Sequence, residues 1–137
     1  GDYTDTPLTC GINYQFKITM STVMVKRQDN VGTTSLIEGR LQLRQFWFNY
    51  ADSGYFRVRV IMKDKKKEYE YLHTSRVLGT LLNILGDAPF TTGTFKFPVQ
   101  SWNENCVIEL DTDAPLPISL VGAGWIGTYV RRSRLFQ

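Results

Sequence analysis

The stretch RLQLRQFWFNYADSGYFRVRV, residues 40–60, alternates apolar and polar side chains along most of its length. A period of two places every second side chain on the same face, which is the pattern of a β-strand with one buried face. The clearest part is YFRVRVIM, residues 55–62, where four apolar side chains share one face and two arginines lie on the other. The turn-forming sequence ADSG, residues 51–54, separates it from the run before, so we predict a β-hairpin over residues 40–62.

The apolar positions change parity inside residues 40–50. The first set is Leu41 and Leu43, and the second set is Phe46, Phe48 and Tyr50. A β-bulge near Gln45 explains the change, because one extra residue exchanges the two faces of a strand. A strand buried on both sides in its second half is the alternative. Either arrangement places Trp47 on the face opposite the three aromatic residues.

Further strands are predicted by the same alternation. They cover residues 14–20, 94–99 and 106–110. Residues 68–73 follow the turn KDKKK at 63–67, which adds a third strand to the hairpin and predicts a three-stranded meander. Pro98 has no backbone N–H to donate, so its strand should lie at a sheet edge or stop there.

The segments between these strands carry turn residues and contain little helical pattern. We predict a polar loop over residues 27–35 and, over residues 76–86, a loop with at most one short helix, since Gly79 and Gly86 limit its length. Together the patterns predict an all-β fold, an antiparallel β-sandwich or barrel-like sheet of about seven strands with little or no helix. The 137 residues correspond to a single β domain, 1–137.

The composition and motifs argue against an enzyme. The chain is 42% hydrophobic and 21% charged with a net charge of +3, which is ordinary for a globular protein. The one histidine, His73, has no nucleophile signature beside it, and no ligand spacing indicates a metal. We therefore expect no catalytic residues, cofactor, metal or membrane span. Cys10 and Cys106 are interpreted as two reduced thiols, with one long-range disulfide as the alternative.

Basic residues form two candidate contact sites. The first is the turn containing Lys63, Lys65, Lys66 and Lys67, which with Arg57 and Arg59 is a candidate DNA-facing surface, or simply a solvated turn. The second is Arg131, Arg132 and Arg134, which directly follow an apolar strand. Arginine favours bidentate carboxylate or phosphate partners, and a polar tail is the alternative.

Glycines and aromatic residues add two further hypotheses. The sequence VGAGWIG, residues 121–127, has no helix pattern after it, so a dinucleotide site is not expected. Repeated glycines in a strand predict a bulge or close approach of another backbone, with the glycines packing around Trp125, which would be a buried plug or an interface anchor. Exposed aromatic residues can also stack on sugars. The candidates for that alternative are Trp47, Trp102, Tyr55 and Tyr69.

Several stretches in order along the chain resemble one known family. They are YTDTPL (3–8), GRLQLRQFWFNYADSGYFRVRV (39–60), RVLG (76–79), TGTFKFPV (92–99) and APLPISLVGAGWIGTYVRRSRLF (114–136). They resemble the C-terminal part of the tail nozzle proteins, or tail tubular proteins B, of short-tailed bacteriophages. The family pattern carries an acidic residue after the tryptophan, where this chain has Ile126, so any salt bridge made there is not expected.

The resemblance implies a structural virion protein assembled in the host cytoplasm, and residues 1–137 as a fragment of it. Such nozzles resemble six-fold rings below a tail adaptor protein, with fibres around them and a channel through which the genome leaves. The implied partners are therefore copies of the same protein in a hexamer, the adaptor, tail fibres and passing DNA. The implied interface residues are Trp125, Arg131, Arg132 and Arg134. A carbohydrate-binding or polysaccharide-degrading tail domain is the alternative.

Overall fold

The computed structural model describes residues 10–35, 39–64, 66–75 and 89–131, and these residues form nine β-strands and no helix. The strands are β1 (Phe16–Thr19), β2 (Lys26–Asp29), β3 (Gly32–Ser35), β4 (Arg40–Ser53), β5 (Tyr55–Met62), β6 (Lys67–Thr74), β7 (Thr91–Trp102), β8 (Cys106–Thr112) and β9 (Leu120–Val130). The segment 76–86, predicted to be a loop with at most one short helix, lies outside the described residues. No described helix is long and apolar enough to cross a membrane.

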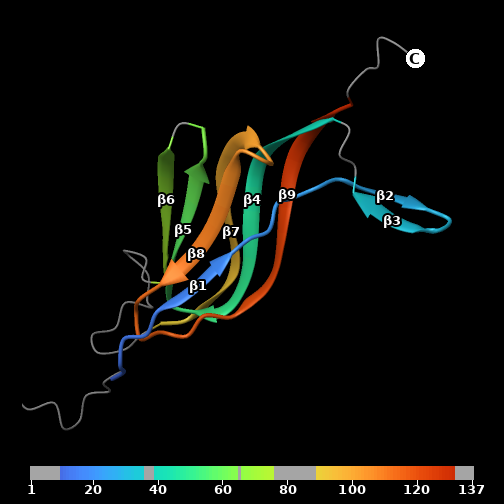
Figure 1. Ribbon diagram of the computed structural model, residues 1–137. Helices are drawn as coiled ribbons and strands as arrows, with labels where there is room; N and C mark the ends of the chain where they lie inside the picture. Colours follow the sequence, from blue (N-terminus) through green and yellow to red (C-terminus); the bar gives the residue numbers. More distant parts are fainter. Residues whose placement is uncertain (1–9, 36–38, 65, 76–88, 132–137) are drawn as a thin grey trace, which may run out of the picture.

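Seven of the strands form two antiparallel sheets that pack face to face (Figure 1). One sheet has the order β1-β8-β5-β6 and the other the order β7-β4-β9. The predicted all-β sandwich is therefore confirmed. The remaining two strands, β2 and β3, pair only with each other, and Figure 1 shows their hairpin away from the sandwich. Residues 27–35, predicted to be a loop, are instead largely strand, because Lys26–Asp29 and Gly32–Ser35 pair around a two-residue turn.

The predicted hairpin over residues 40–62 is wrong. β4 pairs with β7 and β9, whereas β5 pairs with β6 and β8, so the ADSG segment carries the chain from one sheet to the other. Asp52 there has a φ of 45°, and the buried Ser53 donates a hydrogen bond from Oγ to the carbonyl of Ala51. Two strands with one apolar face each can bury those faces against each other across such a crossing. The predicted meander is correspondingly reduced to the pair β5–β6.

The predicted bulge in β4 is confirmed. The register of β4 against both neighbours shifts between Leu43 and Gln45. Against β9 this leaves Arg44 as the extra residue, whereas on the other side Arg44 lies opposite two residues of β7, Val99 and Gln100. Because of this shift, the leucines before the bulge and the aromatic residues after it face the same core, and Trp47 faces away from it. Pro98 lies in β7, which is an edge strand as predicted, although the strand continues beyond it to Trp102.

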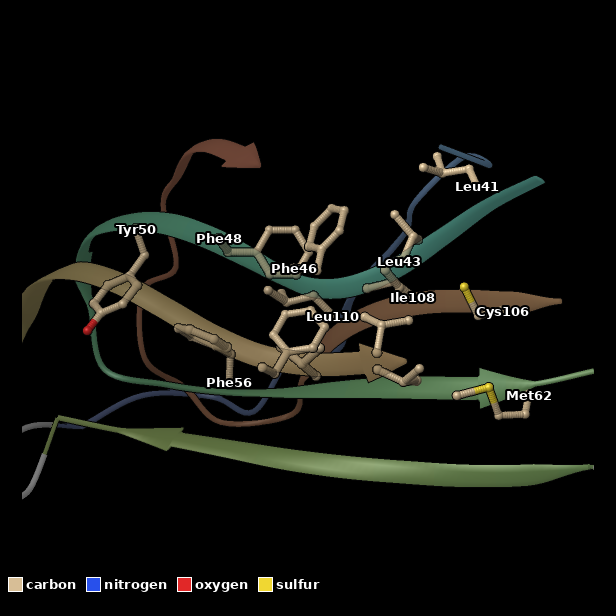
Figure 2. Packing of buried hydrophobic residues seen from close by; sticks show 14 residues of the cluster. Leu41, Leu43, Phe46, Phe48, Tyr50, Phe56, Met62, Cys106, Ile108 and Leu110 are labelled. Atoms are coloured by element: carbon tan, nitrogen blue, oxygen red, sulfur yellow. The ribbon is translucent and has the colours of Figure 1, made fainter. Parts of the chain in front are cut away.

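The core between the sheets is apolar and rich in aromatic rings (Figure 2). Its most buried large side chains are Phe46, Phe48, Phe56, Phe97, Leu43, Leu110, Val58 and Val60. Phe46, Phe48 and Phe97 form a triangle with ring centroids 5.2–5.9 Å apart. Burying each such side chain stabilises the fold by about 1.5–3 kcal/mol, so the facing strands β4, β5, β7 and β8 hold the two sheets together.

Candidate functional site

The predicted lysine cluster lies at the turn between β5 and β6. Lys63, Lys66 and Lys67 are exposed there, and Lys65 lies outside the described residues. The turn is tied to the neighbouring β8 side of the sheet, because the backbone N–H of Lys63 donates to the carbonyl of Asn105 at 2.8 Å. The three ammonium groups thus project from an anchored turn, which is compatible with either a solvated turn or a contact with phosphate.

Arg57 and Arg59 do not belong to that lysine cluster. They lie on the outer face of the β1-β8-β5-β6 sheet and are bound by carboxylates of β8. Nη2 of Arg57 donates to Oδ2 of Asp111 at 2.6 Å, and this hydrogen bond raises the pKa of Arg57. Nε of Arg59 lies 3.3 Å from Oδ1 of Asp111, whose side chain is only 4% exposed.

The ion pairs extend to both sides of these arginines. Arg59 also contacts Glu68 of β6 at 3.3 Å and Glu109 of β8 at 3.7 Å, and Nζ of Lys17 on β1 lies 3.3 Å from the same Glu109 carboxylate. One chain of charges therefore links all four strands of the sheet. Because these guanidinium groups already have partners, they are poorly placed to bind phosphate.

His73 is packed as a core side chain. Its ring centroid lies 4.6 Å from that of Phe56 and 4.5 Å from that of Tyr50. Burial lowers the pKa of His73, and its Nε2 atom has no hydrogen-bond partner among the described residues. Within the same part of the chain, no group of three or more His, Cys, Asp or Glu side chains is arranged to hold a metal. Both thiols are free, with Cys10 exposed and Cys106 buried.

The glycines of β9 make room for β4, as their repetition predicted. A Cβ on Gly127 would lie 2.5 Å from the backbone oxygen of Gln42, and one on Gly124 would lie 2.4 Å from two ring carbons of Trp47. The ring packed against Gly124 is therefore that of Trp47, on the outer face, and not that of Trp125. Trp125 is half-buried on the inner face, where it pairs with Phe46 and packs against the core.

β9 is an edge strand with no charge and no proline along its eleven residues. Natural sheets usually protect an edge by short length, charge, proline or a bulge. The three other sandwich edges have such features: β1 has four residues, β6 carries Lys67, Glu68 and Glu70, and β7 carries Lys96 and Pro98. β9 has one irregularity, a register shift against β4 that leaves Val121 as an extra residue near its start. No charge or proline interrupts the rest of the strand, and Val121, Ile126 and Val130 are 72%, 53% and 57% exposed.

The predicted arginine site begins where β9 ends. Arg131 is exposed and directly follows Val130, the last residue of β9. Arg132 and Arg134 lie outside the described residues. Of the predicted interface residues that the structure describes, Arg131 follows the exposed edge strand, whereas Trp125 lies on the inner side of that strand and packs against the core.

The four aromatic residues considered for sugar stacking divide among different surfaces. Trp47 and Trp102 share the outer face of the β7-β4-β9 sheet, because Trp47 pairs with Lys96 and Trp102 with Gln42. Tyr55 lies on the outer face of the other sheet. Tyr69 lies on the opposite face of β6 from Glu68 and Glu70.

Comparison with known proteins places the chain in a family. Residues 1–136 match the model of the family described as bacteriophage nozzle protein. The chain belongs to the bacteriophage nozzle protein family. It is 32% identical over 124 residues to the tail tubular protein gp12 of Escherichia phage T7, an alignment that covers 90% of this chain and 15% of that protein. This nozzle-family chain is accordingly a structural protein of a phage tail, and it spans about a seventh of the length of that relative.

The sequence reading missed one feature of this nozzle-family domain. Arg40, Arg44 and Lys96 lie on the outer side of the β7-β4-β9 sheet together with the two tryptophans. Part of this face can be recognised from the sequence, since the alternation places Arg40 and Trp47 on the polar face before and after the bulge. Residues of β7 could be added only once its pairing with β4 was known.

Proposed function

We propose that this domain is an assembly module of the nozzle, which joins neighbouring proteins through β9 and the arginines that follow it. The observation that carries the proposal is the long edge strand β9, without charge or proline, in a member of a family of tail structural proteins. An edge strand presents unpaired backbone N–H and C=O groups, which a strand of another chain can complete. Exposed Val121 and Ile126 would add apolar contact area at the same joint.

The arginines give this joint a charged end. A guanidinium group binds carboxylates through two parallel hydrogen bonds, so Arg131, Arg132 and Arg134 would fix the orientation of a partner aligned along β9. Trp125 supports the joint from the inner side, because it anchors the edge strand to the core opposite Phe46.

The larger assembly is proposed from the family. We propose that the complete protein forms a hexameric ring that contacts the tail adaptor protein and tail fibres, surrounds the channel through which DNA passes without sequence-specific contacts, and is assembled in the host cytoplasm before becoming part of the virion. The domain would act in it by binding and not by catalysis. The exposed lysines of the β5–β6 turn are the residues for which contact with passing DNA is proposed.

The experiment uses phage that carry the complete nozzle gene. Replacing Arg131, Arg132 and Arg134 together by Ala should give particles with incomplete tails, seen by electron microscopy and as reduced nozzle protein in purified particles. The matched control replaces Lys63, Lys66 and Lys67 by Ala, which removes the same number of positive charges at a distant turn. If the arginine variant assembles and infects like its parent, the proposal is wrong.

A further inference from the structure

The outer face of the β7-β4-β9 sheet has an unusual composition. The register places on it Arg40, Gln42, Gln45, Trp47, Asn49, Thr94, Lys96, Pro98, Trp102, Gly122, Gly124, Ile126, Thr128 and Val130. None of these side chains is a carboxylate, and Arg44, at the bulge, adds a third cation. Protein interfaces are enriched in tryptophan and arginine and depleted in Asp and Glu, so this composition is that of a binding surface.

The bulge shapes the centre of this face. The register shift between Leu43 and Gln45 coincides with an irregularity in β7, where Gln100 has a φ of 49°. An open hollow of about 710 Å³ results, lined by Gln42, Arg44, Gln45, Pro98, Gln100 and Ile126. Its floor thus offers side-chain amides and a guanidinium group beside exposed apolar carbons. Among the described residues, the hollow has no acidic side chain in its lining.

A tryptophan lies on each side of the hollow, and each has a cation near its ring. The guanidinium carbon of Arg40 lies 5.3 Å from the ring centroid of Trp102, and Nζ of Lys96 lies 5.9 Å from that of Trp47. Trp47 is in addition held against the backbone at Gly124. The two rings are thus fixed apolar contacts with positive charges beside them, an arrangement that suits a partner carrying both apolar and acidic groups.

The outer faces of the two sheets differ in charge. The outer face of the β1-β8-β5-β6 sheet carries Glu68, Glu70, Glu109 and Asp111, and its cations are engaged with carboxylates. Among the residues that the structure describes, the β7-β4-β9 face offers its positive side chains no carboxylate partner of this kind. Carboxylates next appear beyond Trp102, where Asp64 and Glu104 line a separate hollow with Arg40.

We propose that the outer face of the β7-β4-β9 sheet, centred on the hollow between Trp47 and Trp102, docks a carboxylate-bearing protein surface of another tail component. This inference rests on the proposed assembly function and assigns a second contact surface to it. A protein partner fits better than a glycan, because exposed Ile126 and Val130 offer aliphatic contacts and because cations lie near both indole rings. A partner that brings carboxylates to Arg44 and Lys96 gains ion pairs that no carboxylate in the described part of the chain makes with them.

The test uses charge reversal at two exposed side chains of this face. Arg44→Glu with Lys96→Glu is placed in the complete nozzle gene. The matched control is Lys26→Glu with Arg27→Glu on the exposed strand β2, which gives the same change in net charge at residues outside both proposed contact surfaces. A second variant, Arg44→Lys with Lys96→Arg, keeps the charges. Mutant phage are propagated in cells that supply the parental nozzle protein, and particles are then made in one round without it.

The expected result is a loss of nozzle protein from particles of about tenfold or more for the reversed pair, because like charges across an interface are strongly repulsive. The control and the charge-keeping variant should assemble normally, and suppressors of the reversed pair should change Asp or Glu to Lys or Arg in a tail protein. Normal incorporation of the reversed pair would overturn the inference. So would an equal defect in the control, which would indicate a net-charge effect.

Two other outcomes separate this inference from its alternatives. Complete particles that no longer adsorb to host cells would identify the face as a glycan-binding surface and overturn protein docking. Normal assembly of the reversed pair, together with failed assembly after replacement of Arg131, Arg132 and Arg134, would reject this face and leave the assembly function intact. If both sets assemble normally, both proposals are wrong.

Discussion

The contact between Gly124 and Trp47 predicts that the effect of Gly124→Ala on stability changes sign when Trp47 is removed. A Cβ on Gly124 would lie 2.4 Å from Cε2 and Cζ2 of the Trp47 ring, well inside van der Waals contact. Forcing an extra methyl group into such a contact costs roughly 1–3 kcal/mol. Without the ring, alanine should be favoured over glycine within a strand by about 0.5–1 kcal/mol. Gly124→Ala should therefore destabilise the parental domain and stabilise a Trp47→Ala variant.

Urea unfolding followed by far-ultraviolet circular dichroism measures this in four proteins: the parent, the two single variants and the double variant. The coupling free energy between the sites should be about 1–3 kcal/mol. Gly122→Ala is the matched control, because its Cβ would meet Nδ2 of Asn49 at an ordinary 3.5 Å. An equal effect of Gly124→Ala with and without Trp47, or an equal cost at Gly122, would refute the reasoning.

Three further predictions concern buried polar groups. Burial lowers the pKa of His73, so as the pH falls the unfolded chain binds a proton near pH 6.5, before the folded chain does. The free energy of unfolding should therefore fall as the pH drops below 6.5. Urea titrations at several pH values should show a smaller dependence on pH for His73→Phe. Asp111→Asn should lower the free energy of unfolding by roughly 1.5–3 kcal/mol, because Asp111 is buried between two arginines. The side chain of Asp113 is 68% exposed, so Asp113→Asn should change the free energy of unfolding by less than about 0.5 kcal/mol, and denaturation curves of both variants give the comparison. A thiol reagent should modify only Cys10 in the folded protein and Cys106 as well in urea, because burial raises the pKa of the Cys106 thiol; rapid modification of both cysteines under native conditions would contradict the observed packing.

The strands and their faces could be predicted because alternation is a local property of the chain. A side chain in a strand points to one face or the other whatever its pairing partners are. Alternation alone therefore predicts that Phe56 and Val58 share a buried face, and both are fully buried. The same logic located the bulge near Gln45, since only an extra residue brings the leucines before it and the aromatic residues after it to one core. Family membership was likewise readable from ordered motifs.

Strand pairing could not be predicted in this way. The ADSG segment joins two amphipathic strands, and both a hairpin and a crossing between sheets bury their apolar faces, so the local pattern does not distinguish them. The structure selects the crossing, and β4 becomes the central strand between β7 and β9. Similarly, the sequence allows Arg57 and Arg59 to contact DNA, but in the fold Arg57 is hydrogen-bonded to Asp111, which lies 54 residues away in the chain.

The candidate contact surfaces were also only partly predictable from the sequence. Sequence by itself determined that an uncharged strand precedes Arg131, because composition and period are written in consecutive residues. Only the tertiary structure decided that this strand is an edge, that Trp47 packs on Gly124, and that Lys96 and Trp102 join Arg40 and Trp47 on one face. The physical reason is that a surface is assembled from strands distant in sequence, and their register follows from the packing of the whole core.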